Sequence, residues 1–429
     1  MVELSVAFVD NGDPSGAGPV VFLQGGPGVG AVQGAARFVG SQVDLVLFDQ
    51  RGVGGSTPKL ACPGVDALWP RERSAGPDRV ADAQVLSAYQ TCADDLRSAG
   101  IDLNDFNTTA VAADVELLRR LLGHEQWSLW GISYGTRVGL TVMRDHPDGV
   151  RAAVLDSVVP FEIDFFATLI DHASRSIEAL SDACSMDDCE AAHGDFADTF
   201  AALVARLEAE PVIIETTRPV SGEPLSYRVG GAELVEIVFS QLYSRQLLRS
   251  LPRQVSRADF GGLEEMVRGF VARRDPERLD LAIGLYYATW CREEYPFHDP
   301  LIDDAAATRL GEQWGQAVGD AFGSALGTSA IDALCDSFAV EPAPILDDQP
   351  IDSDIPTLVF AGALDPITPP AWSRSVADAL SDAIYVEFAD HGHAMSTRCP
   401  GQIQVDFLRD PSAELDLACA LTAGGPIFD

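Results

Sequence analysis

A serine stands between two glycines in the stretch WGISYGTRVG (residues 130–139), two positions from each of them. Such a pair of glycines has two interpretations. One is packing, because a residue without a Cβ lets a helix lie close to a sheet. The other is a turn so sharp that only glycine fits beside it, which would expose the Ser133 hydroxyl as a nucleophile. In a chain with 38 glycines the stretch alone leaves both interpretations open.

A serine hydroxyl needs an imidazole to accept its proton and a carboxylate to orient that imidazole. Ser133, Asp365 and His393 each follow an apolar run typical of a strand. In an open parallel sheet such positions gather at the carboxyl edge, where ligands bind. The chain order Ser, Asp, His is the order used by the α/β-hydrolase architecture. These three residues are therefore the candidate catalytic triad.

Two of these assignments have competitors. Among the seven histidines only His391 and His393 follow Asp365, and we favour His393 because it lies in a turn beyond a glycine. His391 directly follows Asp390 at the end of a strand-like run, which favours a structural role. Asp365 is preferred because it comes directly after a well-formed apolar strand. The other candidate carboxylates in this part of the chain are Asp352, Asp354, Asp382 and Asp390.

Acyl transfer also needs hydrogen-bond donors aimed at the oxyanion that develops on the carbonyl. One donor is expected from the backbone N–H after the nucleophile, here Tyr134. The second should come from a turn after an early strand, and QGGPG (24–28) occupies such a place. We expect Gly26 to supply it, in a turn that needs glycine for its backbone angles as well.

Both ends of the chain alternate strand-like and helix-like segments, which predicts a mostly parallel central sheet with helices on both faces. Amphipathic helical segments with few strand signals fill the region between them. We therefore predict a hydrolase core built from residues 1–160 and 346–429, with a large helical cap inserted at 161–345. In the DQRG stretch we expect Asp49 and Arg51 to form a buried charged pair that braces a loop below the site.

Composition excludes several classes of function. The 429 residues contain no apolar run near the roughly 20 that a membrane span needs. The net charge is −36, from 65 acidic and 29 basic residues with Lys59 the only lysine, and this repels nucleic acid. The acidic coat is either simply solvated or an adaptation to high salt. Oligomeric state is not indicated.

Eight cysteines, an even number, favour disulfides and an oxidising compartment over buried free thiols. No pair has zinc-knuckle spacing, so we expect no metal, and this chemistry needs no cofactor. Pairing between sequence neighbours is one guess among many, and Cys184–Cys189 would close the easiest loop. The N-terminus resembles a strand and not a signal peptide, as it also would after removal of a leader. We expect a secreted or cell-envelope protein, with a cytoplasmic one as the alternative.

Six motifs occur in register: GGPG, FDQRGVGGS, GISYGT, LDSVVP, GALDPITP and GHAMSTRCP. Together they resemble the α/β-hydrolase serine peptidases of the proline iminopeptidase and tripeptidyl aminopeptidase group. The cysteine-bearing C-terminal segment is closest to the secreted tripeptidyl aminopeptidase-like members. The resemblance covers roughly residues 18–160 and 350–420. It implies an exopeptidase that acts on free peptide N-termini, with Ser133 as nucleophile, His393 as base and acid, and Asp365 as its orienting partner.

Two positions depart from the family pattern. Gln24 stands where the family more often has histidine, which bears on the support of the glycine loop. Ala394 stands where glycine often follows the catalytic histidine. The family also holds the substrate amine with acidic residues of the cap, which here implies Glu293 and Glu294 in YYATWCREEYPF (286–297). Both could instead simply face solvent.

The function expected from the sequence is a serine aminopeptidase that releases residues or short peptides, tripeptides among them, through an acyl-enzyme. A carboxylesterase using the same triad is the alternative, because fold does not fix function. A binding protein on a hydrolase scaffold would lack a triad member, and none is missing here. An aspartate at the turn would indicate dehalogenase or epoxide chemistry, and Ser133 argues against it.

Overall fold

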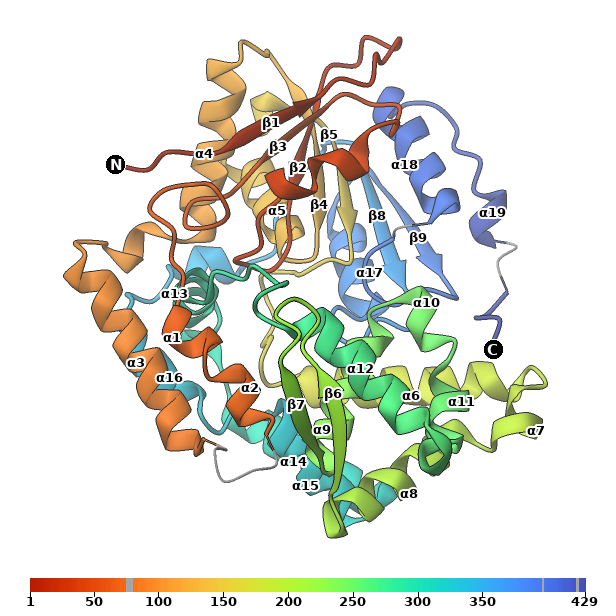
Figure 1. Ribbon diagram of the computed structural model, residues 1–429. Coiled ribbons are helices and arrows are strands. Elements are labelled where there is room, and N and C mark those ends of the chain that lie inside the picture. The colour runs from red at the N-terminus through yellow and green to blue at the C-terminus, as the bar shows by residue number, and fades with distance from the viewer. Residues whose placement is uncertain (75–79, 396, 422–423) are drawn as a thin grey trace.

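Seven strands form one sheet in the computed structural model, which describes residues 1–74, 80–395, 397–421 and 424–429. Across the sheet they run in the order β1-β3-β2-β4-β5-β8-β9, and only the edge strand β1 is antiparallel to its neighbour. Figure 1 shows the sheet in the upper half of the molecule. The strands are β1 (Val6–Val9), β2 (Val20–Leu23), β3 (Leu45–Phe48), β4 (Trp127–Ile132), β5 (Val150–Asp156), β8 (Thr357–Gly362) and β9 (Ala383–Phe388).

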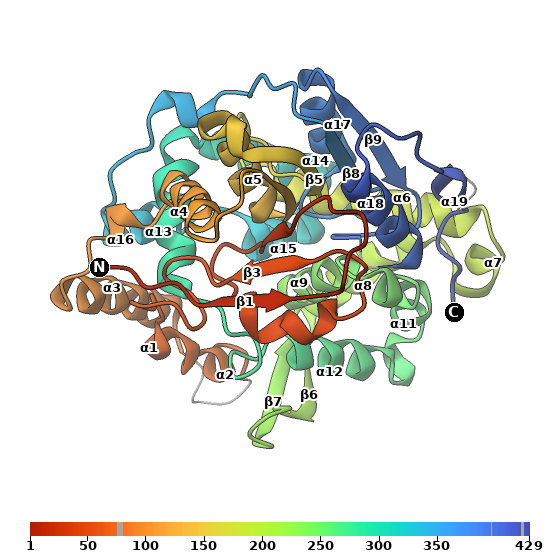
Figure 2. The same cartoon turned by 90° about the horizontal axis from the view of Figure 1, so that it is seen from above.

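Helices cover both faces of the sheet (Figure 2). Alternate strand residues face opposite ways, so that Val21 and Leu23 join one apolar cluster while Val20 and Phe22 join another. The first cluster is covered by α3 (Asp82–Ser98), α4 (Thr108–Leu121), α5 (Tyr134–Asp145) and α17 (Pro370–Ala379). The second is covered by η1 (Val32–Phe38), α18 (Arg398–Arg409) and α19 (Ala418–Leu421). The expected α/β-hydrolase architecture is confirmed.

A largely helical segment separates β5 from β8 in the chain and lies below the carboxyl edge of the sheet in Figure 1. Its third apolar cluster includes residues of the longer helices between residues 169 and 326. These helices are α6 (Leu169–Ser185), α8 (Phe196–Ala209), α9 (Gly231–Leu242), α12 (Gly262–Arg274), α14 (Pro300–Trp314) and α15 (Gln316–Leu326). Shorter helices join them: α7 (Cys189–His193), α10 (Arg245–Leu248) and α11 (Leu251–Ser256).

Two features of this segment were not expected from the sequence. A β-hairpin, β6 (Val212–Thr217) and β7 (Pro224–Val229), lies among the helices, and the alternation of apolar and polar residues in β7 is the sequence signal that could have found it. In addition, α13 (Ile283–Glu293) and α16 (Ile331–Phe338) pack into the first cluster of the hydrolase core. Both contact α3, which also contacts the short helix α1 (Pro63–Asp66); the short helix α2 (Trp69–Glu72) follows α1 in the chain. The division at residues 160 and 345 stays a prediction.

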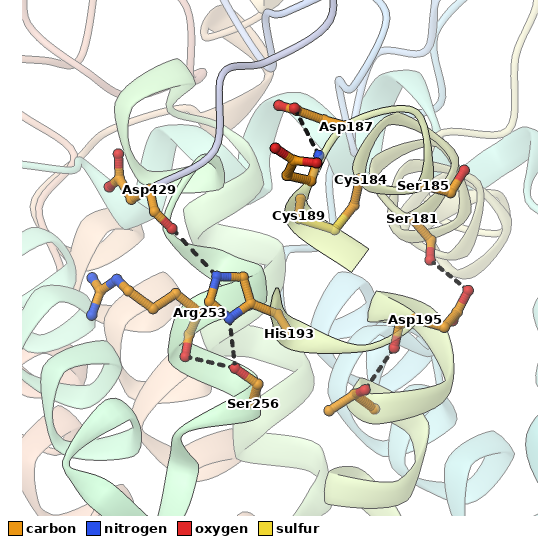
Figure 3. The surroundings of a disulfide bond; sticks show 12 residues. Ser181, Cys184, Ser185, Asp187, Cys189, His193, Asp195, Arg253, Ser256 and Asp429 are labelled. Carbon is orange, nitrogen blue, oxygen red and sulfur yellow. Dashed lines mark hydrogen bonds between the residues drawn. A yellow bond between two sulfur atoms is a disulfide. The ribbon is translucent and has the colours of Figure 1, made fainter. Parts of the chain in front are cut away.

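All eight cysteines form disulfides, and each pairs with its neighbour in sequence: Cys62–Cys92, Cys184–Cys189, Cys291–Cys335 and Cys399–Cys419. Figure 3 shows the shortest loop, which links the end of α6 to the start of α7 beside His193. The expectation of disulfides is confirmed, as is the guess of neighbour pairing. Within the described ranges, no helix combines the length and the apolar character needed to cross a bilayer.

Candidate active site

Ser133 lies at the junction of β4 and α5. Its backbone has φ of 55° and ψ of −128°, a conformation that residues other than glycine rarely adopt. A Cβ on Gly131 would stand 2.5 Å from the carbonyl oxygen of Gly135, which closes the turn. A Cβ on Gly135 would stand 1.9 Å from the carbonyl oxygen of Leu23 in β2, which brings α5 against the sheet. Both interpretations of the two glycines therefore hold, one for each. The turn leaves Ser133 partly exposed.

His393 and Asp365 form a hydrogen-bonded pair at the same edge of the sheet, with 2.8 Å between His393 Nδ1 and Asp365 Oδ2. The loops after β8 and β9 bring them together. Thr368 completes the pair, since its hydroxyl lies 2.7 Å from Asp365 Oδ2 and 3.1 Å from His393 Nδ1. The backbone N–H groups of Ile367 and Thr368 donate to Asp365 Oδ1. This leaves the Nε2 side of the ring for proton exchange.

The pKa values of the pair follow from its surroundings. Burial opposes ionisation of Asp365, but the charge and hydrogen bond of His393, together with the Thr368 donors, outweigh it and lower the pKa of Asp365. Burial likewise disfavours a charged His393, yet the charge and hydrogen bond of Asp365 raise the pKa of His393 above its usual value. Asp365 therefore stays ionised at neutral pH and stabilises an imidazolium.

The His393 loop is fixed from the helical segment. The backbone N–H of His393 donates to the carbonyl oxygen of Tyr243 at 3.0 Å, and the Tyr243 ring meets the His393 ring edge-on at 4.9 Å between centroids. A Cβ on Gly392 would stand 1.8 Å from the carbonyl oxygen of Leu242, so no other residue fits there. Ala394 has a φ of 68°, a left-handed conformation that explains why glycine often stands there in the family.

The glycine loop after β2 lies directly beside Ser133. A Cβ on Gly25 would stand 2.9 Å from Ser133 Cβ. Gly26 is exposed with a φ of 129°, and Gln50 supports the loop by donating to the carbonyl oxygen of Gln24 at 2.9 Å. Tyr134 is the first residue of α5, where a backbone N–H has no partner within the helix. Tyr134 directly follows Ser133, and Gly26 directly follows Gly25, which lies beside Ser133; their role as oxyanion donors stays a prediction.

Glu293 and Glu294 are in the interior, 4% and 1% exposed, and neither faces solvent. Glu293 accepts from the backbone N–H and the hydroxyl of Thr108 at 2.7 and 2.6 Å. Glu294 binds Arg137 Nη1 and accepts from the backbone N–H of Phe165. Burial raises the pKa of both carboxyls, while the Arg137 charge opposes the rise. Arg137 of α5 is thus a charged neighbour of both carboxylates, and a role for them in binding a substrate amine stays a prediction.

The structure also shows the surroundings of three other residues that the sequence analysis singled out, Asp49, Arg51 and His391. Arg51 pairs with Asp114 at 2.7 Å and not with Asp49, so the expected charged pair was wrong in its partner. Asp49 instead accepts from the backbone N–H groups of Ala31, Val32 and Gly55 and braces the loop in that way. His391 binds Asp390 at 2.6 Å, which fits a structural role. Ser396, part of the last of the six motifs, lies outside the described residues.

Sequence reasoning missed two polar residues beside the pair, Thr368 and Asp156. Thr368 lies three positions after Asp365, a spacing at which a hydroxyl and a backbone N–H can both reach a carboxylate in a turn. Asp156 ends β5, between the strands that precede Ser133 and Asp365, and it is fully buried. A charged residue that directly follows an apolar strand was the available signal.

A cavity of about 320 Å³ lies between α1, α2 and the helices α9, α12 and α13. Its apolar walls include Trp69, Phe239 and Leu281, and its charged groups are Asp66, Glu72, Arg73, Glu236 and Arg274. Leu281 pairs with Val29 next to the glycine loop, and Arg274 lies over the Tyr243 ring that contacts His393. The cavity wall is therefore linked to the glycine loop through Leu281 and Val29, and to His393 through Arg274 and Tyr243.

The charges in this cavity are not balanced. Arg73 pairs with Glu236 at 2.5 Å, whereas no hydrogen bond or ion pair among the described residues engages the Glu72 carboxylate. Burial, with Glu236 and Asp82 nearby, raises the pKa of Glu72, although the Arg73 charge opposes this. Burial and Asp280 raise the pKa of Asp66 in the same way. A cation entering the cavity would relieve the cost of burying these carboxylates.

Comparisons with known proteins agree with this architecture. Residues 18–177 match the family described as the alpha/beta hydrolase fold, and residues 320–419 match the family described as TAP-like protein. A probable proline iminopeptidase of Streptomyces coelicolor is 33% identical over 34% of this chain and 34% of its own length. The serine protease Hip1 of Mycobacterium tuberculosis is 31% identical over 36% of this chain and 31% of its own. The matched part thus spans about a third of these relatives.

Among solved structures, the alpha/beta hydrolase MGS-M2 from a deep-sea metagenome library aligns over 97% of this chain and 96% of that one. Its identity of 14% and TM-score of 0.43 are too low to inform function. The sheet order, the two family matches and the curated relatives lead to one conclusion. The chain has the α/β-hydrolase fold with a TAP-like C-terminal part, and it resembles the proline iminopeptidases and the serine protease Hip1.

Proposed function

We propose that the protein is a serine exopeptidase that acts through an acyl-enzyme. It removes single residues or short peptides, tripeptides among them, from the free N-termini of peptides. Ser133 is the nucleophile, His393 the general base and acid, and Asp365 the group that orients His393. Gly26 and Tyr134 supply the oxyanion donors. The observation that carries this proposal is the 2.8 Å His393–Asp365 pair at the sheet edge that also carries the Ser133 turn.

In the first step His393 Nε2 accepts the Ser133 proton while Ser133 Oγ attacks the scissile carbonyl carbon. The oxyanion is stabilised by the backbone N–H groups beside Ser133. His393 then donates the proton to the leaving amine, and the C–N bond breaks. A water molecule, deprotonated by His393, then attacks the acyl carbon. The bond between Ser133 Oγ and that carbon breaks, His393 returns the proton to Ser133 Oγ, and the N-terminal fragment leaves with a free carboxylate.

The substrate amine is bound in the acidic cavity, with Glu72 as the principal anchor and Asp66 beside it. Support comes from the Glu72 carboxylate, which has no partner in the part of the chain that the structure describes, and from the apolar walls that include Leu281, the partner of Val29 beside the glycine loop. Glu293 and Glu294, the residues that the family resemblance suggested, support this site only indirectly, because they bind Arg137 and Thr108. An extracellular or cell-envelope location is part of the proposal and is supported by the four disulfides.

The test is a release assay with Pro-, Ala- and Ala-Ala-Pro-p-nitroanilide, the same compounds with acetylated amines, and p-nitrophenyl butyrate. The enzyme and its Ser133→Ala variant are compared. Cleavage of the free-amine peptides alone, lost in the variant, is the expected result, and the panel shows whether one or three residues leave. Ester turnover without amide turnover would make the protein a carboxylesterase. Activity that survives Ser133→Ala would remove Ser133 from the mechanism.

A further inference from the structure

Three non-glycine residues with left-handed backbone lie side by side at the carboxyl edge of the sheet. They are Ser133, Ser157 and Ala394, with φ of 55°, 60° and 68°. Such conformations cost about 1 kcal/mol or more each and persist where surrounding contacts hold them. These three come from the ends of β4 and β5 and from the loop after β9. Ser133 and Ala394 both bond to the Asp156–Ser157 dipeptide, which contains the third of them.

Asp156 and Ser157 bind both segments that carry the reacting side chains. The carbonyl oxygen of Asp156 accepts from the backbone N–H of Ser133 at 2.9 Å. Asp156 Oδ2 accepts from the backbone N–H of Met395 at 2.8 Å. The Ser157 hydroxyl accepts from the backbone N–H of Ala394 at 2.9 Å and lies 3.2 Å from Asp156 Oδ1. One dipeptide therefore fixes the nucleophile turn and the two residues that follow His393.

We propose that Asp156 is a positioning residue of the triad, which sets the Ser133 turn against the His393 loop and adds a second negative charge near the His393 ring. This inference rests on the proposed function, since it assigns Asp156 a part in the same reaction. Asp156 touches no substrate atom and takes no proton from Ser133. It acts through His393 and through the backbone on which Ser133 and His393 stand.

The negative charge of Asp156 acts on His393 in addition to the hydrogen bonds that Asp156 accepts. Asp156 is fully buried, and its hydrogen-bond partners favour the ionised form of its carboxyl group. The titratable groups that face it are His393 from the loop after β9 and Asp365 from the loop after β8. Burial raises the pKa of Asp156 to about 6, although the Met395 N–H, His393 and Ser157 oppose the rise. In return the Asp156 charge contributes to the raised pKa of His393. The two groups therefore titrate as a coupled pair.

The test compares the wild type with Asp156→Asn, which keeps an acceptor of the same shape and removes the charge. The rate of Ser133 labelling by a fluorophosphonate probe is measured from pH 5 to pH 9. We expect about a tenfold slower labelling at pH 8, and an acid limb that moves down by about half a pH unit because His393 loses a stabilising charge. Asp303→Asn is the matched control. Asp303 is another buried carboxylate that accepts an N–H and a hydroxyl, both from Thr328, in the helical segment.

A second measurement does not depend on reaction at Ser133. The pKa of His393 is followed by NMR in protein labelled at the histidine Cε1, with His393→Gln used to assign the signal. The proposal is supported if the pKa of His393 is lower in Asp156→Asn than in the wild type and is unchanged in Asp303→Asn. Equal pKa values of His393 in the wild type and both variants overturn it. Failure of the proposed function would appear separately, as labelling that survives Ser133→Ala.

Ser157→Ala separates geometry from charge and keeps the test open should Asp156→Asn fail to fold. It removes the acceptor for the Ala394 N–H and leaves the Asp156 carboxylate in place. We expect slower labelling with an unchanged pKa of His393. Labelling at the wild-type rate in this variant would overturn the positioning role of the dipeptide.

Discussion

Gly135 lies with its Cα against the carbonyl oxygen of Leu23, so that a Cβ on Gly135 would stand 1.9 Å from that oxygen. The oxygen belongs to the buried end of β2 and cannot swing aside as the end of a flexible side chain could. We therefore predict that Gly135→Ala displaces the start of α5, removes reaction at Ser133 and lowers the free energy of unfolding by about 3 kcal/mol. Urea unfolding and fluorophosphonate labelling measure the two effects.

The same helix supplies the control. A Cβ on Gly139 would meet Leu155 Cδ2 at 3.2 Å and Leu23 Cδ1 at 3.5 Å, and both are ends of flexible side chains. Alanine also favours a helix interior over glycine by about 1 kcal/mol, so Gly139→Ala should leave stability within that margin and keep Ser133 reactive. Equal losses in the two variants would show that the close approach at Gly135 is not what fixes the turn.

The arrangement at the sheet edge was largely predictable because its signals are local. Ser133, Asp365 and His393 each follow a short apolar run, and parallel strands bring their carboxyl ends to one edge. The disulfide pairing could also be guessed from the sequence, because each cysteine bonds to the next cysteine along the chain. The β6–β7 hairpin was not found, because its strands lie among amphipathic helices and β6 has a single buried residue, which makes its alternation weak.

The proposed amine site could not be predicted in this way. Adjacent acidic residues at the end of a helix give no sign of the direction in which they point. Glu294 is turned inward by Arg137, which lies 157 positions away in sequence and is 1% exposed. Such a pair forms only when α5 and α13 pack together. The cavity around Glu72 likewise depends on helices from three separate parts of the chain.

The pH dependence of catalysis follows from the His393–Asp365 pair. The active form needs a neutral His393, whose pKa is raised above 6.5 by Asp365 despite burial. Catalysis should therefore fall as the pH drops through that raised value. Asp365, whose pKa is lowered, remains ionised throughout this range. The measurement is kcat/KM for the best free-amine substrate between pH 5 and pH 9.

Thr368→Val provides the corresponding variant, because it removes one of the hydrogen bonds to Asp365 and leaves the Thr368 backbone donor. Losing a donor that favours the carboxylate should raise the pKa of Asp365 and reduce kcat/KM by about tenfold. The assay is the same pH profile. A wild-type acid limb centred well below pH 6.5 would contradict the raised pKa of His393.

The four disulfides should differ in their contribution to stability. Cys291–Cys335 spans 44 residues and joins α13 to α16, whereas Cys184–Cys189 spans 5 residues. Because a cross-link restricts the unfolded chain more when its loop is longer, the longer loop should contribute about 2 kcal/mol more. Urea unfolding of the Cys291→Ala/Cys335→Ala and Cys184→Ala/Cys189→Ala double variants tests this difference. Equal losses would mean that local packing, not loop length, decides the contribution.

The cavity carboxylate and the buried ion pair predict opposite outcomes for two Glu→Gln substitutions. Glu72 has no ion-pair partner among the described residues, and its raised pKa means that burial of its charge costs stability above the pKa of an exposed glutamate. Glu72→Gln should therefore not lower the free energy of unfolding at pH 8. It should raise KM for free-amine peptides about tenfold through loss of a charged hydrogen bond, and leave ester turnover unchanged.

Glu294→Gln should behave in the reverse way. It leaves the buried Arg137 charge with the more distant Glu293 carboxylate, 3.5 Å away, as its ion-pair partner among the described residues, so stability should fall by about 3 kcal/mol. The folded fraction should keep the wild-type ratio of KM values for free and acetylated peptides. This ratio and urea unfolding, both measured for the two variants, distinguish a residue that binds the substrate amine from one that stabilises the fold. If Glu294→Gln loses its preference for free amines and Glu72→Gln keeps it, the substrate amine is bound at Glu294 and not at Glu72.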